Sequence, residues 1–398
     1  MNDFTFLSQF WEGFKVTQVS KSESNINFKL EPNTQGRCHC GLTAISTHDS
    51  TWRYINDVSF LGLRVTLKVL TRRIVCSQCG VMTEAIEWLT PYARMTNRLR
   101  NYVEGLLNIL PIKHISEHTG LHWHTVKEID KRKLAREIKE PDWSSITRLA
   151  MDEFAVFKGH RYATVIVNAD TYQVLWIGEG RSRKQIRPFF ELLGKDNCKN
   201  IEAVAMDMNT AFDLEVNEHC PNARVVYDLF HVVAKYGREV IDRVRVDQAN
   251  QLRHDKKARH WVKRSRWVLL KNRANLTGSQ ESHLDQLLAM NKDLMTTYVL
   301  GEQLKELWYC DSEEQSQHLW DVWWQQAQES GLKPLLDFAR KLKPYVHGIV
   351  ATATYQMNTC TLEGMNNKIK LIKRMAYGYR DSAYFFLKIK AAFPGKAR

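Results

Sequence analysis

Two aspartates stand where apolar segments meet loops, and their position is the first sign of chemistry. Asp152 lies in LAMDEF, at the end of an expected first strand, and Asp207 lies in AVAMDMN, after a second apolar segment. An acidic side chain there costs desolvation energy unless it is hydrated, hydrogen-bonded or bound to a cation. Adjacent strands can bring the two ends together, so the pair predicts a shared metal ion. Each aspartate alone is more often a loop residue or a helix cap.

A third acidic residue, Glu363, begins a helix that is dense in basic residues. It lies early in LEGMNNKIKLIKRM, with Asn358 or Thr359 as the expected helix cap. The basic residues that follow it are Lys368, Lys370, Lys373 and Arg374. This pattern offers an oxygen ligand for Mg²⁺ beside cations that bind a DNA backbone. The plain alternative is a solvated amphipathic helix.

Two close pairs of cysteines bracket a segment near the N-terminus. The pairs are Cys38 and Cys40 in RCHCG, and Cys76 and Cys79 in CSQCG. Four thiolates from two such turns can hold a structural Zn²⁺ ion and stabilise a small domain. The first pair has a spacer of one residue, which strains the usual turn, so His39 or His48 can replace one thiolate. Ordinary buried cysteines are the plain alternative.

A helix-turn-helix pattern follows in IKHISEHTGLHWHTVKEIDKRKL. Gly120 suits a tight turn between a short first helix and a longer second one. The residues expected near the exposed start of the second helix are His122, Trp123, His124, Thr125 and Lys127. Residues at this place enter the major groove of DNA in such motifs, and we expect DNA contact here. A helical hairpin without DNA contact remains the alternative.

The pattern of apolar residues along the chain predicts an α/β protein with several parts. Residues 1–90 show period-two alternation in RVTLKVLTRRIVC and predict a small β-rich domain, whereas residues 91–145 have helical spacing. Residues 146–235 predict three strands, a helix, a strand, a helix and a strand, which is typical of a mixed sheet with flanking helices. Residues 236–345 are helical in pattern, and residues 346–398 carry one more short segment and the basic helix.

Charge and hydropathy narrow the class of partner. Lys and Arg number 57 against 44 Asp and Glu, which gives a net charge of +13 and favours a polyanion such as nucleic acid. No apolar run reaches the roughly 18 residues that cross a bilayer, and the N-terminal segment has no signal-peptide pattern. We therefore expect a cytoplasmic protein without a membrane partner.

Several motifs together resemble one enzyme family. MDEF, VAMDMN, YDLFHVV, RWVLLKNRANL and LEGMNNKIKLIKRMAYGYR are similar to the insertion-sequence transposases of the ISL-three family, a branch of the DDE transposases. The resemblance implies a zinc-binding region at 1–90 and a helix-turn-helix region at 91–145. It also implies a ribonuclease-H-like core in two parts, 146–235 and 346–398, which are separated by a helical insertion at 236–345.

The resemblance also implies a reaction and its residues. Asp152, Asp207 and Glu363 match the catalytic carboxylates, which would hold two Mg²⁺ or Mn²⁺ ions for strand cleavage and strand transfer. Asp228 and His231 in YDLFH match a further motif, and we expect His231 to orient a phosphate or a water, or else to satisfy a core hydrogen bond. The implied partners are the terminal inverted repeats of the element and target DNA, bound by a homodimer or higher assembly in the nucleoid.

Two other functions stay open. A non-enzymatic DNA-binding regulator would bind DNA without Mg²⁺-dependent cleavage, and a metal-dependent nuclease would cut DNA without joining strands. A basic tract also allows two interpretations: residues 245–273 hold ten Lys and Arg around Trp261 and Trp267. These tryptophans either lie on a surface that follows DNA or pack helices together.

Overall fold

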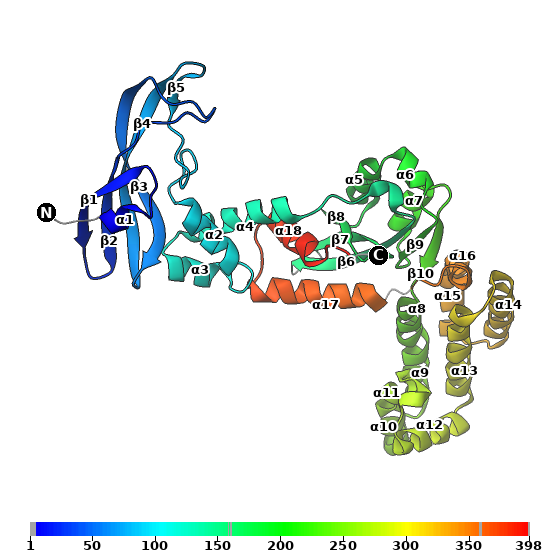
Figure 1. The fold of residues 1–398 in the computed structure, drawn as a ribbon. Helices are drawn as coiled ribbons and strands as arrows, with labels where there is room; N and C mark the ends of the chain where they lie inside the picture. Colours follow the sequence, from blue (N-terminus) through cyan, green and yellow to red (C-terminus); the bar gives the residue numbers. More distant parts are fainter. Residues whose placement is uncertain (1–4, 158, 160, 358–359, 397–398) are drawn as a thin grey trace. The chain divides into compact units, whose positions relative to one another are not determined.

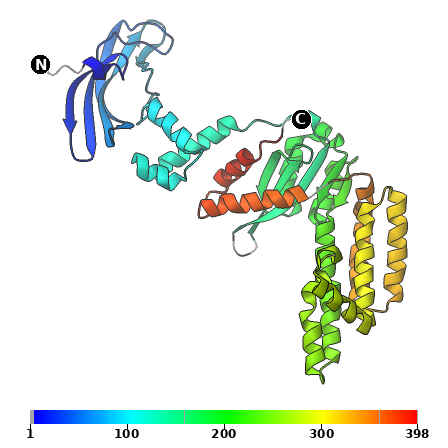
Figure 2. The same ribbon diagram turned by 60° about the horizontal axis from the view of Figure 1, so that its bottom comes forward.

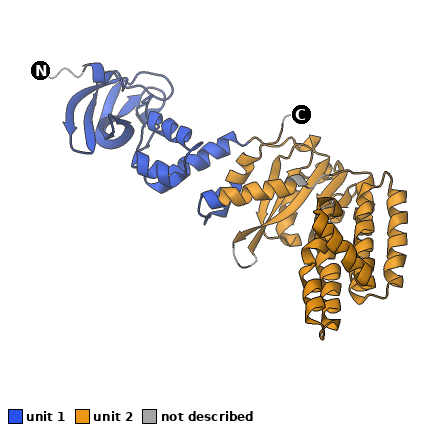
Figure 3. Cartoon of the chain, turned by 90° about the horizontal axis from the view of Figure 1, so that it is seen from below, with its two compact units in different colours: residues 1–138, 374–387 blue, residues 139–373, 388–398 orange. Residues whose placement is uncertain are grey.

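The structure is a computed structural model that describes residues 5–157, 159, 161–357 and 360–396. It divides into two compact units, residues 1–138 with 374–387, and residues 139–373 with 388–398 (Figure 3). Each unit contains one five-stranded sheet with both parallel and antiparallel pairs, together with helices. The α/β class predicted from the sequence is confirmed.

The sheet of the first unit forms because its strands alternate between buried and exposed residues. Its strands are β1 (Phe14–Lys21), β2 (Asn25–Pro32), β3 (Ser46–Phe60), β4 (Leu63–Cys76) and β5 (Gly80–Thr83), in the order β1-β2-β4-β3 with β5 paired to β4. Val65, Leu67 and Val69 of β4 are buried in one apolar cluster. A two-residue turn joins β3 to β4, with positive φ at Leu61 (51°) and Gly62 (79°). This turn fixes the register of the longest strand pair.

Helices complete the first unit. They are α1 (Thr5–Ser8), α2 (Asn97–Leu106), α3 (Ile112–Thr119), α4 (Trp123–Glu137) and the start of α18 (Ser382–Ala392). Gly120, at φ 71°, ends α3 and turns the chain toward α4, as the sequence predicts. Leu99, Val103, Ile115 and Val126 form the apolar centre of α2, α3 and α4.

The sheet of the second unit is the mixed sheet predicted for 146–235. Its strands are β6 (Arg148–Phe157), β7 (Arg161–Asn168), β8 (Val174–Glu179), β9 (Ala203–Met206) and β10 (Arg224–Tyr227), in the order β10-β9-β6-β7-β8. The strands β6, β9 and β10 run parallel, whereas β7 is antiparallel to both β6 and β8. The helices α5 (Arg183–Leu193), α6 (Lys195–Lys199) and α7 (Thr210–His219) lie within the connections between the strands.

The two faces of this sheet have different neighbours. Leu149 and Met151 of β6 pack in one cluster with Phe189 of α5 and Phe212 of α7. Side chains alternate along a strand, so residues such as Asp152 point to the opposite face. Helix α17 (Cys360–Met375) lies alongside that part of the sheet (Figure 2), and Asn366 contacts Asp152 there.

A long helical stretch joins β10 to α17, as the sequence predicts. It comprises α8 (Leu229–Tyr236), the π-helical turn η2 (Gly237–Ile241), α9 (Asp242–Gln251), α10 (Lys256–Arg264), α11 (Arg266–Leu270), η3 (Arg273–Asn275), α12 (Gly278–Met290), α13 (Lys292–Glu306), η4 (Leu307–Tyr309), α14 (Glu313–Glu329), α15 (Lys333–Leu342), η5 (Lys343–Tyr345), α16 (Val346–Val350) and η6 (Ala351–Ala353) (Figure 1). Its apolar core, with Trp320 and Trp323, is continuous with that of the sheet. Trp308 Nε1 donates to the carbonyl of Tyr227 at 3.0 Å and ties the stretch to the end of β10.

The last part of the chain differs in detail from the expectation. The basic helix is α17, but a second helix, α18, follows where the sequence analysis names none. The expected caps Asn358 and Thr359 lie outside the described residues. Among the described residues, no helix is both long and apolar enough to cross a membrane.

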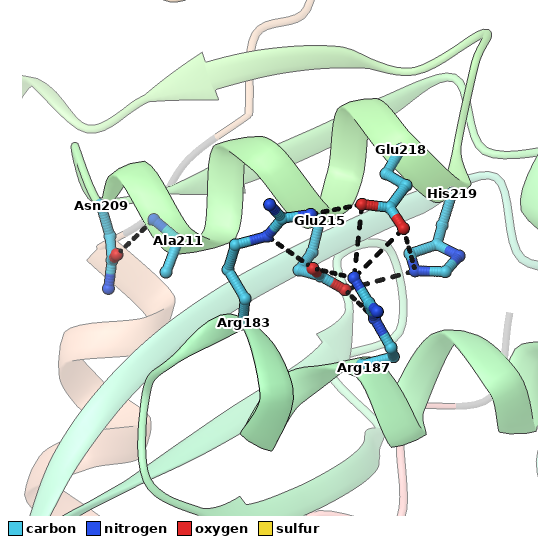
Figure 4. Close-up of polar contacts among 7 residues, drawn as sticks. All are labelled: Arg183, Arg187, Asn209, Ala211, Glu215, Glu218 and His219. Carbon is cyan, nitrogen blue, oxygen red and sulfur yellow. Dashed lines mark hydrogen bonds and ion pairs between the residues drawn. The ribbon is translucent and has the colours of Figure 1, made fainter.

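A buried charge network fastens α7 to α5 (Figure 4). The fully buried carboxylate of Glu215 accepts from Arg183 Nε at 2.7 Å and from Arg187 Nη2 at 2.8 Å, and His219 Nε2 lies 3.2 Å away. Glu218 contacts the same arginines, but its side chain is 46% exposed. Burial raises the pKa of Glu215, but the hydrogen bonds from Arg187 and Arg183 outweigh burial, so the net pKa lies below its ordinary value.

We expect Glu215→Gln to lower the free energy of unfolding by about 1–3 kcal/mol, because it leaves two arginines facing a neutral amide. A depressed carboxyl pKa stabilises the folded state at neutral pH, and this stabilisation is lost as pH falls through the folded pKa. The difference from wild type should therefore shrink below a pH of about 4. The matched control, Glu218→Gln, should cost less than about 1 kcal/mol because its carboxylate is exposed. Equal losses in urea unfolding of both variants would refute this assignment.

Candidate metal and nucleic-acid site

Three aspartates lie level with one another across three parallel strands. In the ladder, Ala150 of β6 pairs with Ala205 of β9, and Tyr227 of β10 pairs with Met206 of β9. Continuing this register places Asp152, Asp207 and Asp228 in one row. Residues in one row of a parallel ladder point to the same face, so the three carboxylates converge on the face opposite α5 and α7.

Asp152 lies within its strand and not at its end, which corrects the expectation from the sequence. β6 continues to Phe157 because the residues after Asp152 still pair with β7. The partner β9 pairs with β6 only as far as Ala150, so the side chain of Asp152 stands beyond the end of the neighbouring strand. Asp152 can meet a ligand because it lies past the last residue of β9 that pairs with β6, although it is not at the end of β6 itself.

The carboxylate of Asp152 is hydrogen-bonded on both oxygens. Oδ1 accepts from the backbone N–H of Glu153 at 2.7 Å, and Oδ2 accepts from Asn366 Nδ2 at 2.5 Å. Burial, and then the negative charge of Asp207, raise the pKa of Asp152 to about 6. The group is therefore costly to ionise unless a cation is near it.

Asp207 is paired with a histidine. Asp207 Oδ2 lies 2.9 Å from His231 Nδ1, while His231 Nε2 lies 3.9 Å from Asp228 Oδ2. The hydrogen bond to Asp207 raises the pKa of His231 above its ordinary value, against the effect of burial. A protonated His231 thus offsets part of the negative charge of the row.

The loops that carry these residues are fixed by helix caps. Asn209 caps α7 by accepting from the N–H of Ala211 at 3.0 Å, and its own N–H donates to the carbonyl of Asp207 at 2.6 Å. Asp228 caps α8 by accepting from the N–H of Phe230 at 2.8 Å. Both aspartates therefore hold defined positions at the strand ends.

The donor set suits a hard divalent cation. One ligand atom from each of Asp207, Asp228 and His231 lies within 4.8 Å of the other two. Carboxylate oxygens are the usual protein ligands of Mg²⁺, and an imidazole nitrogen is compatible with Mn²⁺. The position of Asp152 in the same row adds a third carboxylate to this face.

Helix α17 places Asn366, and not Glu363, in contact with the row. Glu363 is exposed and forms no hydrogen bond with any residue that the structure describes. It stands three residues before Asn366, on the same face of the helix and one turn earlier. The predicted third carboxylate is therefore on the helix that meets the sheet, but it is not part of the observed hydrogen-bonded group.

The sequence alone does not identify Asp228 and Asn366 as residues of this group. Asp228 carries the same signal as Asp207, an acid directly after a short apolar strand, but YDLFH marks it only as part of a family motif. Asn366 has no such signal, because asparagine side chains are common on helices and its partner lies 214 residues away.

The four basic residues of α17 fall into two kinds. Lys368 Nζ donates to the carbonyl of Ala392 at 2.8 Å, and Lys373 Nζ lies 3.4 Å from the carbonyl of Ala155. Lys370 and Arg374 are exposed. The first two fasten the helix to its surroundings, and the other two remain open to solvent.

The start of α4 presents an exposed aromatic group. His122 caps the helix by accepting from the N–H of His124, and the ring of His124 stacks on Trp123 at 3.7 Å. Thr125, in the first turn, is partly exposed. Lys127 differs, because its side chain is only 15% exposed and its ammonium group is 2.6 Å from Asp381. This pairing leaves Lys127 little surface for a phosphate.

The four N-terminal cysteines come together in the first unit. The sulfur atoms of Cys38, Cys40, Cys76 and Cys79 all lie within 4.8 Å of one another, and Cys40 and Cys76 are 3.6 Å apart. Tetrahedral zinc with bonds of about 2.3 Å requires sulfur separations of about 3.8 Å, which this cluster fits. His48, an alternative ligand, instead contacts Asp49 at 3.1 Å.

The thiols of this cluster have different pKa values because their hydrogen-bond partners differ. Backbone N–H groups of Cys79 and Gln78 lower the pKa of Cys76 to about 7. The hydrogen bond to Cys40, the contact with Cys38 and burial raise the pKa of Cys79 to about 12. Four thiolates therefore cannot form together unless a cation compensates their charge.

Comparison with known proteins agrees with this layout. A family profile described as "Transposase" matches residues 149–389, and one described as "Helix-turn-helix domain of transposase family ISL3" matches residues 84–132. The second range contains α2, α3 and the first part of α4.

Two curated relatives extend the match. The chain is 49% identical to the transposase for insertion sequence element IS1001 of Bordetella parapertussis, over 98% of this chain and 97% of that protein. It is 26% identical to the transposase for insertion sequence element IS1557 of Mycobacterium tuberculosis, over 80% of this chain and 76% of that protein. The chain belongs to the ISL3 family of insertion-sequence transposases.

Proposed function

We propose that this transposase cleaves and joins DNA strands by divalent-metal chemistry at the row formed by Asp152, Asp207 and Asp228, with Glu363 as a further ligand. The observation that supports the proposal is the ladder register, which, continued beyond the paired residues, aligns three carboxylates on one face of the sheet. The strand order, three antiparallel strands followed by two parallel ones on the other side of β6, supports a ribonuclease-H-like core.

The residues present fit two Mg²⁺ or Mn²⁺ ions. Asp152 and Asp207 would hold them, and Glu363 would join from α17. When bound, the ions supply activation of a water or a DNA 3′-hydroxyl and stabilise the leaving oxygen. Asn366 orients Asp152 by donating to Oδ2, and the N–H of Glu153 donates to Oδ1, so each oxygen keeps a further lone pair for a metal ion. No side chain has to act as a nucleophile.

His231 is proposed to hold a proton beside Asp207 and to orient a phosphate or a water at the site. Its Nδ1 lies 2.9 Å from Asp207 Oδ2, so the ring stands next to a carboxylate that would hold a metal ion. This role makes His231 a positioning residue.

DNA-end recognition is proposed for the start of α4. His122, Trp123, His124 and Thr125 offer exposed donors and aromatic surface at the helix end that enters a groove in helix-turn-helix proteins. Lys370 and Arg374 would bind the backbone near the catalytic helix, and pairing two element ends calls for a dimer or higher assembly. The zinc ion is proposed to be structural, because four cysteines leave no open coordination position.

The reaction is tested on DNA that carries the flanking inverted repeats, with Mg²⁺ or Mn²⁺ added. We expect Asp152→Asn, Asp207→Asn and Glu363→Gln to lose at least about 1,000-fold of cleavage and joining while retaining DNA binding, because each removes a charged metal ligand. The matched control is Glu153→Gln, whose side chain lies on the other face of β6 and pairs with Arg181 at 2.8 Å. It should keep near wild-type activity.

Other outcomes of this assay discriminate between functions. Binding by the wild type without any product would support a regulator, and cleavage without joined strands would support a nuclease. Full activity in Glu363→Gln, with loss in the two aspartate variants, would remove Glu363 from the proposed ligand set.

Metal binding is tested by stability as a function of pH. Because the folded protein binds the Asp152 proton up to a pH of about 6, the free energy of unfolding without metal should fall as pH rises from about 4 to about 6. This contribution is at most about 3 kcal/mol and should be absent from Asp152→Asn. Added Mg²⁺ at pH 7.5 should raise the melting temperature of wild type but not of Asp207→Asn. Equal Mg²⁺ effects on both proteins would contradict a site at this row.

Zinc is tested by metal content and chelation. We expect about one zinc ion per chain in wild type, and loss of zinc with melting of the β1–β5 sheet in Cys76→Ser and Cys79→Ser. His39→Ala and the distant Cys310→Ala are the controls and should retain the ion. Loss of zinc in His39→Ala would move that histidine into the ligand set, and a zinc-free wild type with a stable sheet would disprove the site.

A further inference from the structure

Helix α10 presents a face made of positive charge. Its basic residues are Lys256, Lys257, Arg259, Lys263 and Arg264. At about 100° per residue, these residues and His260 occupy one half of the helix circumference. The opposite half holds Trp261 and Val262, so the helix separates cationic and apolar residues completely.

Within the part of the chain that the structure describes, no carboxylate forms an ion pair with any of the five basic residues of α10. The acid beside them, Asp255, caps the helix by accepting from the N–H groups of Lys257 and Ala258, both at 3.0 Å. By contrast, Arg266 pairs with Asp242 at 3.0 Å, and Arg273 pairs with Asp285 at 2.8 Å. Uncompensated charge on one face attracts a polyanion.

The other side of α10 is firmly packed. Trp261 stacks on His283 of α12 with ring centroids 4.8 Å apart, and Val262 is buried. Ser265 is fully buried and its hydroxyl donates to the carbonyl of Trp261 at 2.9 Å. The helix beneath the cationic face is therefore fixed by packing, and only the basic side chains have to become ordered on binding.

The second tryptophan of the basic tract, Trp267 of α11, is exposed to solvent. Trp267 stands three residues after Arg264, and 71% of its surface is exposed. The guanidinium of Arg266 lies 5.1 Å from its ring centroid, which places a cation beside the indole. The two tryptophans of the basic tract thus differ, since Trp261 packs against α12 and Trp267 faces solvent. An exposed indole offers a face on which a nucleic-acid base can stack, and the unpaired cations of α10 directly precede it in the chain.

A single helical run connects the proposed reaction site to this face. The run Leu229–Gln251, made of α8, η2 and α9, begins beside Asp228 and His231. At 1.5 Å per residue it is roughly 34 Å long, about one turn of duplex DNA. Figure 1 shows α10 and α11 at the end of this run that is remote from the sheet.

We propose that the basic face of α10 binds the phosphate backbone of duplex DNA about one helical turn from the cleaved bond, and that Trp267 stacks on a base outside the duplex. The position relative to the cleaved bond rests on the proposed function. Binding itself needs no catalysis and can be measured separately. The helical insertion is then a second DNA-binding element, apart from the helix-turn-helix region.

The charge is tested by removing it from the full chain. We expect the triple variant Lys256→Ala, Lys263→Ala, Arg264→Ala to bind inverted-repeat DNA about 10-fold more weakly near 0.1 M salt, with a salt slope smaller by about 2–3. The matched control is Lys333→Ala, Arg340→Ala, Lys341→Ala on α15, which removes equal charge from the same insertion. There Lys341 is paired with Glu239 at 3.1 Å. The control should change affinity less than about 2-fold.

The length of the DNA makes this test specific. The difference between the two triple variants should vanish on duplexes that extend less than about one turn past the cleavage position, and return on longer ones. Equal weakening by both triple variants would reduce the effect to bulk charge and overturn the proposal. Unchanged affinity of the α10 variant would overturn it as well, provided that circular dichroism shows both variants folded.

The stacking is tested with 2-aminopurine placed at an unpaired position of the same DNA. Trp267→Ala should weaken binding about 10-fold and leave the probe fluorescence unchanged on binding, and Trp267→Phe should restore most of the quenching. Fully paired DNA should bind Trp267→Ala and wild type equally, and a matching loss on paired DNA would disprove stacking. Binding is measured in Asp152→Asn protein and cleavage in wild type, so an inactive wild type would refute the proposed reaction without touching the α10 result.

Discussion

Mutual repulsion between carboxylates that neighbouring parallel strands hold side by side is the constraint on which the candidate site depends. The register of β6, β9 and β10, continued past the last paired residues, brings Asp152, Asp207 and Asp228 into one row. The protein compensates each one differently. Asp152 retains its proton to a higher pH, Asp207 pairs with His231, and Asp228 caps α8. Each compensation is one that a cation can replace.

These compensating groups come from elements outside the sheet, and this couples the site to the insertion. His231 lies on α8, where the insertion starts, whereas Asn366 lies on α17, after it ends. The insertion shares its apolar core with the sheet, and the indole of Trp308 bonds to the last residue of β10. The hydrogen bond between Asp152 and Asn366 thus joins residues on either side of the insertion, 214 positions apart in the chain.

The sequence predicts the parts of this site that local chemistry determines. Asp207 directly follows an apolar strand, so its place at the strand end can be read from the sequence. The two cysteine turns bracket a β segment, and the pairing of its strands brings the four cysteines together. Asp152 is harder to place, since Ala155 and Phe157 continue its strand and only the shortness of β9 exposes it. Asn366 cannot be found from spacing, because its role arises from the angle at which α17 meets the sheet. Trp261 and Trp267 look equivalent in the sequence, but in the structure Trp261 stacks on His283.

The same distinction governs where the positive charge can act. A net charge of +13 predicts a polyanionic partner but not the surface that binds it, because many Lys and Arg side chains already contact other groups of the protein. Lys127 is paired with Asp381, and Lys368 is bonded to the carbonyl of Ala392. The cations of α10 have no such partners in the described chain, and its apolar side is fixed by packing. A cation that already forms an ion pair contributes less free energy to phosphate binding. Unpaired cations on a rigid face are therefore better evidence for DNA binding than the total number of cations.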